Sequence, residues 1–206
     1  MKMPMSTAAT AAFRELSFKF SGYTIWLTPR DTDLIVAKTL QRIATDLSIS
    51  RVPSPHFTLI YDASFESDAA AMGRFGEVKK AVREFPALQC TGCVMDVELA
   101  GVNGGLMDMA WAEISYKRAE EGRESFEKAI AAFTGNCSEG MWEKWVPHMS
   151  LAYDEPRDRR LDIGVLVDAV RGEPGLMQEK REIVGMELWR TEGRMAEWEK
   201  LDYYEF

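Results

Sequence analysis

The chain contains two copies of one short phrase, and its only two histidines lie at the same place in each copy. Residues 55–62 read Pro-His-Phe-Thr-Leu-Ile-Tyr-Asp, and residues 147–154 read Pro-His-Met-Ser-Leu-Ala-Tyr-Asp. Pro, His, Leu, Tyr and Asp each recur 92 positions later (148 − 56). Such a repeat predicts a site built from two related halves, with one copy of the phrase in each.

Each copy has the polar and apolar alternation of a half-buried β-strand. Side chains two positions apart in a strand point to the same face. His56 and Thr58 should therefore share a face, as should His148 and Ser150, while the residues between them point to a core. If a pseudo-two-fold axis relates the two strands, two imidazoles and two hydroxyls converge on one cleft.

This set of groups suits phosphodiester chemistry. Imidazole titrates near neutral pH, so one ring can accept a proton while the other donates one. Hydroxyls can donate hydrogen bonds to the non-bridging oxygens of a phosphate. One histidine can activate water on one side of phosphorus while the other protonates the leaving oxygen, and this scheme needs no metal or other cofactor.

Hydrophobic spacing and turn signals divide the rest of the chain into helices and strands. The pattern predicts helices over much of 32–48, from about 67 to Pro86, around 126–133 with an end at Gly135, and within 158–171. It predicts strands at 88–100 and 106–115 around an Asn103-Gly104-Gly105 turn, at 145–152, and as a final hairpin of 182–190 and 195–203. This order indicates an α+β fold with antiparallel pairing.

The two phrases resemble the motifs of the two-histidine phosphoesterase superfamily, and within it the chain is similar to the cyclic phosphodiesterases of plants and yeast. Residues 23–29 resemble the opening strand of that family, 147–153 its second motif, and 188–199 its final hairpin. The resemblance covers roughly residues 20–204. It implies a bilobal fold, with two pseudo-symmetric antiparallel sheets and outer helices around a central cleft. We therefore expect a flexible tail at 1–20 and one domain at 21–206.

The resemblance also implies roles for single residues. His56 and His148 would be the acid–base pair, and Thr58 and Ser150 the phosphate-binding hydroxyls. Which histidine is the base is not fixed, and our first assignment has His148 activating water and His56 protonating the leaving oxygen. The remaining site residues would be Tyr153, at the border of phosphate and nucleoside, and Trp26, lining the cleft.

The activity implied is hydrolysis of 2′,3′-cyclic nucleotides to 2′-phosphates, and of ADP-ribose 1″,2″-cyclic phosphate to the 1″-phosphate, within RNA metabolism such as tRNA splicing. One alternative is cleavage or ligation of 2′–5′ linkages in short oligonucleotides. Another is a nucleotide-binding module without turnover. The resemblance leaves the role of Tyr61 open, although this residue repeats Tyr153.

The net charge of −8 narrows the choice of partner. Tracking long nucleic acid requires a basic surface, so we expect a small cyclic nucleotide or ADP-ribose cyclic phosphate as substrate, with no long nucleic acid and no membrane as partner. We expect a cytoplasmic monomer. Cys90-x-x-Cys93 lacks further ligands for zinc, and free thiols are the simpler interpretation of the three cysteines.

Overall fold

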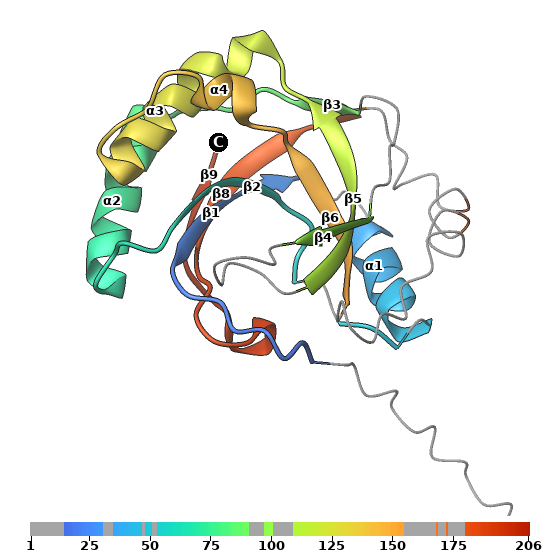
Figure 1. Ribbon diagram of the computed structural model, residues 1–206. Coiled ribbons are helices and arrows are strands. Elements are labelled where there is room, and N and C mark those ends of the chain that lie inside the picture. The colour runs from blue at the N-terminus through green and yellow to red at the C-terminus, as the bar shows by residue number, and fades with distance from the viewer. Residues whose placement is uncertain are drawn as a thin grey trace, which may run out of the picture.

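The computed structural model describes residues 15–30, 35–46, 48–50, 53–90, 97–100, 109–154, 168, 172 and 180–206 (Figure 1). Side chains at 35, 89–90, 97–100 and 109–115 lie outside the description. The strands are β1 (Tyr23–Pro29), β2 (Phe57–Asp62), β3 (Leu88–Cys90), β4 (Val97–Ala100), β5 (Met109–Lys117), β6 (His148–Asp154), β7 (Lys180–Arg181), β8 (Ile183–Arg190) and β9 (Glu199–Glu205). The helices are α1 (Ile35–Asp46), α2 (Asp68–Ala81), α3 (Arg123–Thr134) and α4 (Met141–Lys144), with 3-10 turns η1 (Glu120–Gly122) and η2 (Met195–Glu197).

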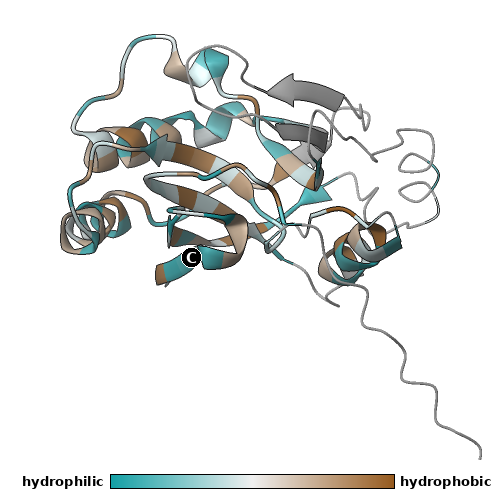
Figure 2. Cartoon of the chain, turned by 60° about the horizontal axis from the view of Figure 1, so that its bottom comes forward, coloured by the Kyte–Doolittle hydropathy of each residue, from teal (hydrophilic) through white to brown (hydrophobic). Residues whose placement is uncertain are grey.

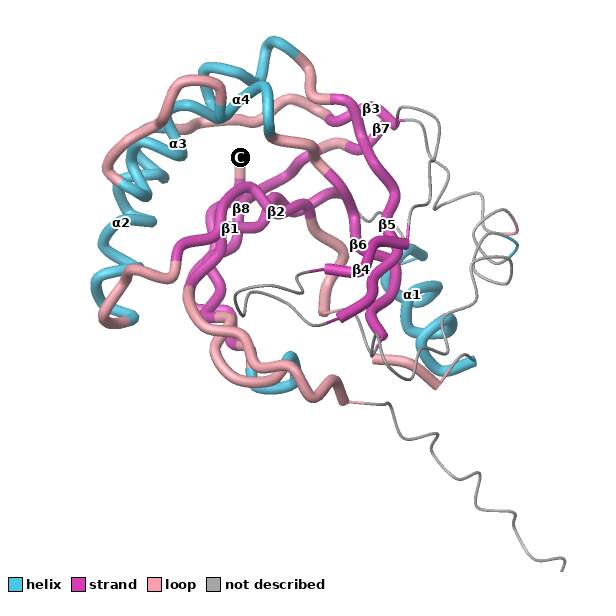
Figure 3. The backbone as a smooth tube through the Cα atoms, in the orientation of Figure 1, coloured by secondary structure: helices cyan, strands magenta, loops and turns pink. Residues whose placement is uncertain are grey.

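The strands form two antiparallel halves that meet at the histidine motifs. One half has the order β2-β1-β8-β9, and the other has the order β6-β5-β3-β7 with β4 also pairing with β5. The halves join where Phe57 of β2 pairs with Met149 of β6, the residues that directly follow the two histidines. Figure 3 shows the strands of the two halves curving toward each other. The predicted α+β fold with antiparallel pairing is confirmed.

The repeat in the sequence extends to the backbone of the two motif strands. Against β1, strand β2 carries one extra residue, because Ile25 pairs with Ile60 and the next residue, Trp26, pairs with Thr58. Against β5, strand β6 carries its extra residue at Leu151, which is 92 positions after Leu59. A bulge moves the side chains beyond it to the other face of the strand. Both halves therefore bend at the same place in the repeat.

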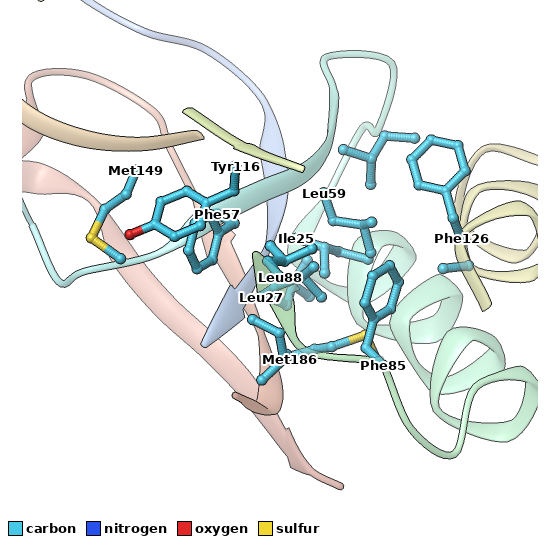
Figure 4. Close-up of a cluster of buried hydrophobic side chains, with 14 of the residues drawn as sticks. Ile25, Leu27, Phe57, Leu59, Phe85, Leu88, Tyr116, Phe126, Met149 and Met186 are labelled. Carbon is cyan, nitrogen blue, oxygen red and sulfur yellow. The ribbon is translucent and has the colours of Figure 1, made fainter. Parts of the chain in front are cut away.

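The core lies where the sequence predicts it, behind the histidines. Phe57 and Met149, each between a histidine and its hydroxyl residue, are 0% and 1% exposed. Figure 4 shows them beside Tyr116, whose ring meets Phe57 edge-on at 4.9 Å. Burying a side chain of this size contributes about 1.5–3 kcal/mol, so the same strands that carry the histidines also hold the halves together.

The helices lie outside the strands. Helices α2 and α3 pack side by side, and α1 lies on the opposite side of the molecule, against β6 (Figure 1). Each carries both hydrophobic and hydrophilic residues (Figure 2). Ser67 caps α2, where its hydroxyl accepts a hydrogen bond from the amide of Ala70 at 3.3 Å. Gly135 ends α3 with φ of +86°, a conformation that glycine adopts without strain.

Several bounds of the predicted elements differ from the structure. Residues 195–197, predicted as part of a strand, form η2, and Trp145, predicted as the start of a strand, follows the end of α4. The predicted end of the second helix at Pro86 is wrong, because α2 ends at Ala81 and Val82 is extended. Val82 and Phe85 are nonetheless buried, so their helical spacing reflects core packing by an extended segment. Within the region 88–100, predicted as one strand, the structure describes β3 and β4, which both pair with β5, and residues 91–96 lie outside the description. The predicted turn at 103–105 lies outside the described residues, as does the predicted helix within 158–171 except for Asp168.

The predicted boundary between tail and domain stays a prediction, since residues 1–14 lie outside the description. Just before that boundary, Leu16 is 4% exposed, and Phe20 forms a bridge with Gly193. Among the helices that the structure describes, none combines the length and the apolar character that a bilayer span requires.

Gly185 allows β8 and β9 to approach, and replacing it should separate them. A Cβ atom there would lie 2.5 Å from the carbonyl oxygen of Tyr204 and 2.7 Å from the hydroxyl of Tyr203. We expect Gly185→Ala to lower the free energy of unfolding by about 1–3 kcal/mol, as overpacking does. Gly73→Ala is the matched control, because nothing lies within 4 Å of its Cβ. It should stabilise α2 by up to about 1 kcal/mol. Urea denaturation measures both, and equal effects would contradict this account.

Candidate active site

The two histidines stand next to each other at the junction of the halves. His56 directly precedes β2, and His148 is the first residue of β6. Pairing of Phe57 with Met149 brings the two strand starts together. The charge of His148 also lowers the pKa of His56. The structure brings together the two strand starts that carry the histidines, and the convergence of the two imidazoles on one cleft stays a prediction.

Both rings are oriented in the same way. His56 Nδ1 lies 2.6 Å from the carbonyl oxygen of Ser54, and His148 Nδ1 lies 3.1 Å from that of Val146. A carbonyl oxygen only accepts hydrogen bonds, so Nδ1 carries the hydrogen in each ring. Nε2 is therefore the nitrogen that can accept or release a proton in both. In each case the carbonyl belongs to the residue two positions before the histidine. The repeated phrase therefore gives both histidines the same tautomer.

The surroundings of His56 favour its neutral form. Its side chain is buried, and the ring stacks on the indole of Trp26 with centroids 3.7 Å apart and 11° between the planes. Burial lowers the pKa of His56 to about 4, with a smaller lowering from the charge of His148 and an opposing effect of the hydrogen bond to Ser54. His56 is therefore neutral at pH 7. His148 is only half-buried, so the two histidines differ in environment although they match in sequence.

The two hydroxyl residues also occupy different environments. Ser150 is buried, and its Oγ accepts a hydrogen bond from the hydroxyl of Tyr153 at 2.8 Å. This contact depends on the bulge at Leu151, because a regular strand would point residues three apart to opposite faces. Thr58 is half-buried, and its carbonyl oxygen accepts a hydrogen bond from Trp145 Nε1 at 3.0 Å.

The repeated tyrosine marks where the pseudo-symmetry ends. Tyr153 is 8% exposed and holds Ser150, whereas its counterpart Tyr61 is 44% exposed. The hydroxyl of Tyr61 donates to the carbonyl oxygen of Ser21, in the segment before β1. The two tyrosines therefore make different contacts, and Tyr61 serves to fasten the segment before β1.

The structure brings three of the sequence-predicted residues together, namely Trp26, Thr58 and His56. Trp26 pairs with Thr58 across β1 and β2, so both are on the face that carries His56. Its indole is 2% exposed because His56 covers it. Sequence reasoning missed Glu187, the partner of Trp26 on β8, since a polar residue in an alternating strand gives the same pattern when it faces solvent. The hydrogen bond from Trp145 to the carbonyl oxygen of Thr58 had no signal in the sequence either.

Comparisons with solved structures agree with this architecture. Escherichia coli LigT in its apo form matches with a TM-score of 0.50 and 11% identity, covering 90% of this chain and 97% of LigT. LigT complexed with phosphate matches with a TM-score of 0.47 and 10% identity, covering 92% and 99%. Kluyveromyces marxianus Usb1 matches with a TM-score of 0.45 and 9% identity, covering 88% and 99%.

Comparisons of the sequence alone found no relative. No protein-family model matches the chain, and no curated protein matches it. The match to apo LigT extends over nearly the whole of both chains. The chain therefore has the fold of LigT.

Proposed function

We propose that this protein is a two-histidine phosphoesterase that hydrolyses cyclic phosphodiesters without a metal. The observation that carries the proposal is the matched pair of rings, each with Nδ1 on the carbonyl oxygen two residues before it, which makes Nε2 the nitrogen that exchanges a proton. The fold shared with LigT, a member of that superfamily, supports it. The site would consist of His56 and His148, with Thr58 and Ser150 on the phosphate, and with Tyr153 and Trp26 beside them.

Burial suggests the reverse of our first assignment of acid and base. A base must be unprotonated at rest, and a pKa of about 4 keeps His56 neutral at pH 7. His148 is half-buried, so its ring is the more accessible of the two to solvent. We therefore assign the base to His56 and the acid to His148.

The reaction then balances as the addition of water across one P–O bond. Water attacks phosphorus, and its proton passes to His56 Nε2. The bond from phosphorus to the 3′ oxygen breaks, and that oxygen takes a proton from His148 Nε2, which gives a 2′-phosphate. Thr58 and Ser150 would donate to the non-bridging oxygens. The hydroxyl of Tyr153 donates to Ser150 Oγ, which leaves the hydrogen of Ser150 to point at the phosphate.

The second candidate is action on 2′–5′ linkages in short oligonucleotides. The fold shared with LigT, a 2′–5′ RNA ligase-like protein, is the observation in its favour. The net charge of −8 is unfavourable to a long polyanionic substrate. A substrate of one or two nucleotides avoids this repulsion, so the cyclic mononucleotide remains our first choice.

The test is incubation with 2′,3′-cyclic nucleotides in excess EDTA, followed by identification of the product isomer. We expect quantitative 2′-phosphate. ADP-ribose 1″,2″-cyclic phosphate and a 2′–5′ dinucleotide serve as parallel substrates. Cleavage of the dinucleotide alone would favour the second candidate. Tight binding of a cyclic nucleotide without any product would leave only the binding-module alternative.

A further inference from the structure

A cluster of aromatic rings lies behind His56, on the side of the ring that faces β1. The indole of Trp26 stacks on the histidine and in turn packs against Trp189 at 4.5 Å and Trp198 at 6.0 Å. Phe20 closes the cluster with its ring edge-on to Trp198 at 4.6 Å. Trp189 and Trp198 come from the two ends of the β8–β9 hairpin connection, so this hairpin supports the indole under His56.

A carboxylate is tied into this cluster. Glu187 pairs with Trp26 across β1 and β8, and it is 8% exposed. Its Oε2 accepts a hydrogen bond from Trp189 Nε1 at 2.7 Å, and its Oε1 accepts one from Lys200 Nζ at 3.0 Å. A buried carboxylate is unfavourable unless both oxygens are paired, and here they are. The bond from Lys200 holds the carboxylate, and the carboxylate in turn holds the indole N–H of Trp189, against which Trp26 packs.

The contacts form a continuous chain from β9 to the histidine. Lys200 holds Glu187, Glu187 holds Trp189, Trp189 packs on Trp26, and Trp26 stacks on His56. The hydrogen bond to Ser54 fixes one edge of the imidazole, and the stack fixes one face. An edge and a face together leave one direction for Nε2. We propose that Trp26 is a positioning residue for His56 and that Glu187, acting through Trp189, holds the indole in place.

This role distinguishes the two halves of the molecule. The register position opposite Thr58 is Trp26 in the first half, and the position opposite Ser150 is Glu113 in the second. An indole at the first position keeps water from His56, which is the cause of its low pKa. Among the side chains that the structure describes, the charge of His148 lowers the pKa of His56, and the Glu187–Lys200 ion pair lies behind Trp26. That ion pair is neutral overall, and burial, to which the stacked indole contributes, is the largest cause of the low pKa of His56.

The two histidines make the proposal measurable without a substrate. Their imidazole resonances can be followed by NMR against pH, and His148→Asn identifies which signal is His56. In Trp26→Leu we expect the pKa of His56 to rise from about 4 toward 6.5, because water reaches the ring. Trp26→Phe keeps an aromatic face and should preserve most of the shift. Glu187→Gln keeps an oxygen for Trp189 but loses the charge that pairs with Lys200. The pKa of His56 in this variant should therefore lie between the values in Trp26→Phe and Trp26→Leu.

Phe133→Leu is the matched control, since it shortens a fully buried aromatic residue on α3 that packs on Phe65 instead. It should reduce stability while leaving the pKa of His56 unchanged. An unchanged pKa in Trp26→Leu would overturn the proposal, as would an equal change in Phe133→Leu.

The inference rests on the proposed function only for its kinetic readout. There, Trp26→Leu should lower kcat at least tenfold with little change in KM, and Trp26→Phe should recover most of it. A rise in KM with kcat unchanged would mean that Trp26 binds substrate, and it would overturn the positioning role. If the wild-type protein turned over no phosphodiester while the NMR shifts followed expectation, the proposed function would fail and the positioning of His56 would stand.

Discussion

Replacing either histidine by asparagine should lower kcat/KM for a cyclic phosphodiester by about 10²–10⁴ while the fold is kept. Asparagine retains an N–H group near the position of Nδ1, so the hydrogen bonds to the carbonyl oxygens of Ser54 and Val146 can persist. It has no counterpart of Nε2, so proton transfer is lost. Turnover in excess EDTA and a thermal unfolding curve measure the two properties separately.

Tyr61→Phe is the matched control for this experiment. Tyr61 repeats Tyr153 in sequence, but its hydroxyl contacts Ser21 and not the hydroxyl residue of its own motif. It should therefore retain nearly full activity. Normal turnover by His148→Asn would rule out the two-histidine mechanism whatever Tyr61→Phe does.

The protein should lose stability as the pH falls from about 6.5 to about 4, and His56 should account for much of the loss. In the unfolded chain this histidine has its ordinary pKa of 6.5, and in the folded protein its pKa is about 4. Because the folded state resists protonation, its advantage is fully present above pH 6.5 and disappears as the pH falls toward 4. The difference corresponds to about 3 kcal/mol.

Urea denaturation at a series of pH values measures this loss in the wild-type protein and in His56→Asn. The variant should show a shallower dependence on pH, because the buried titrating group is gone. His148→Asn should keep most of the dependence, since burial is the larger cause of the low pKa. A His56→Asn curve parallel to the wild-type curve would show that other groups carry the acid sensitivity.

The alternation of polar and apolar residues correctly predicted which face the first residues of each motif occupy. It failed in both motifs at the same position, the bulge. His56, Phe57, His148 and Met149 lie on the expected faces, because the strands are regular there. Beyond Leu59 and Leu151 the bulges shift the register, and no residue type in either copy marks a bulge. The hydrogen bond from Tyr153 to Ser150 follows from this shift, so spacing alone could not have predicted it.

The sequence also could not predict contacts between segments that are far apart in the chain. Trp26 was expected at the site from a resemblance, but its stack on His56 depends on the register between β1 and β2. The low pKa of His56 follows from that burial. Helix ends were predictable where a local signal exists, as at Ser67 and Gly135, and not where a helix stops without one, as at Ala81.

The two halves join where Phe57 of β2 pairs with Met149 of β6. The turnover rate of the proposed reaction should therefore depend on how the two halves are docked. Each half contributes one of the two histidines to which we assign proton transfer. A rotation of one half that leaves its own core intact would still change the separation of the two imidazoles. Proton transfer tolerates little change in distance. Small losses of alignment at this seam should therefore appear in turnover before they appear in the melting temperature.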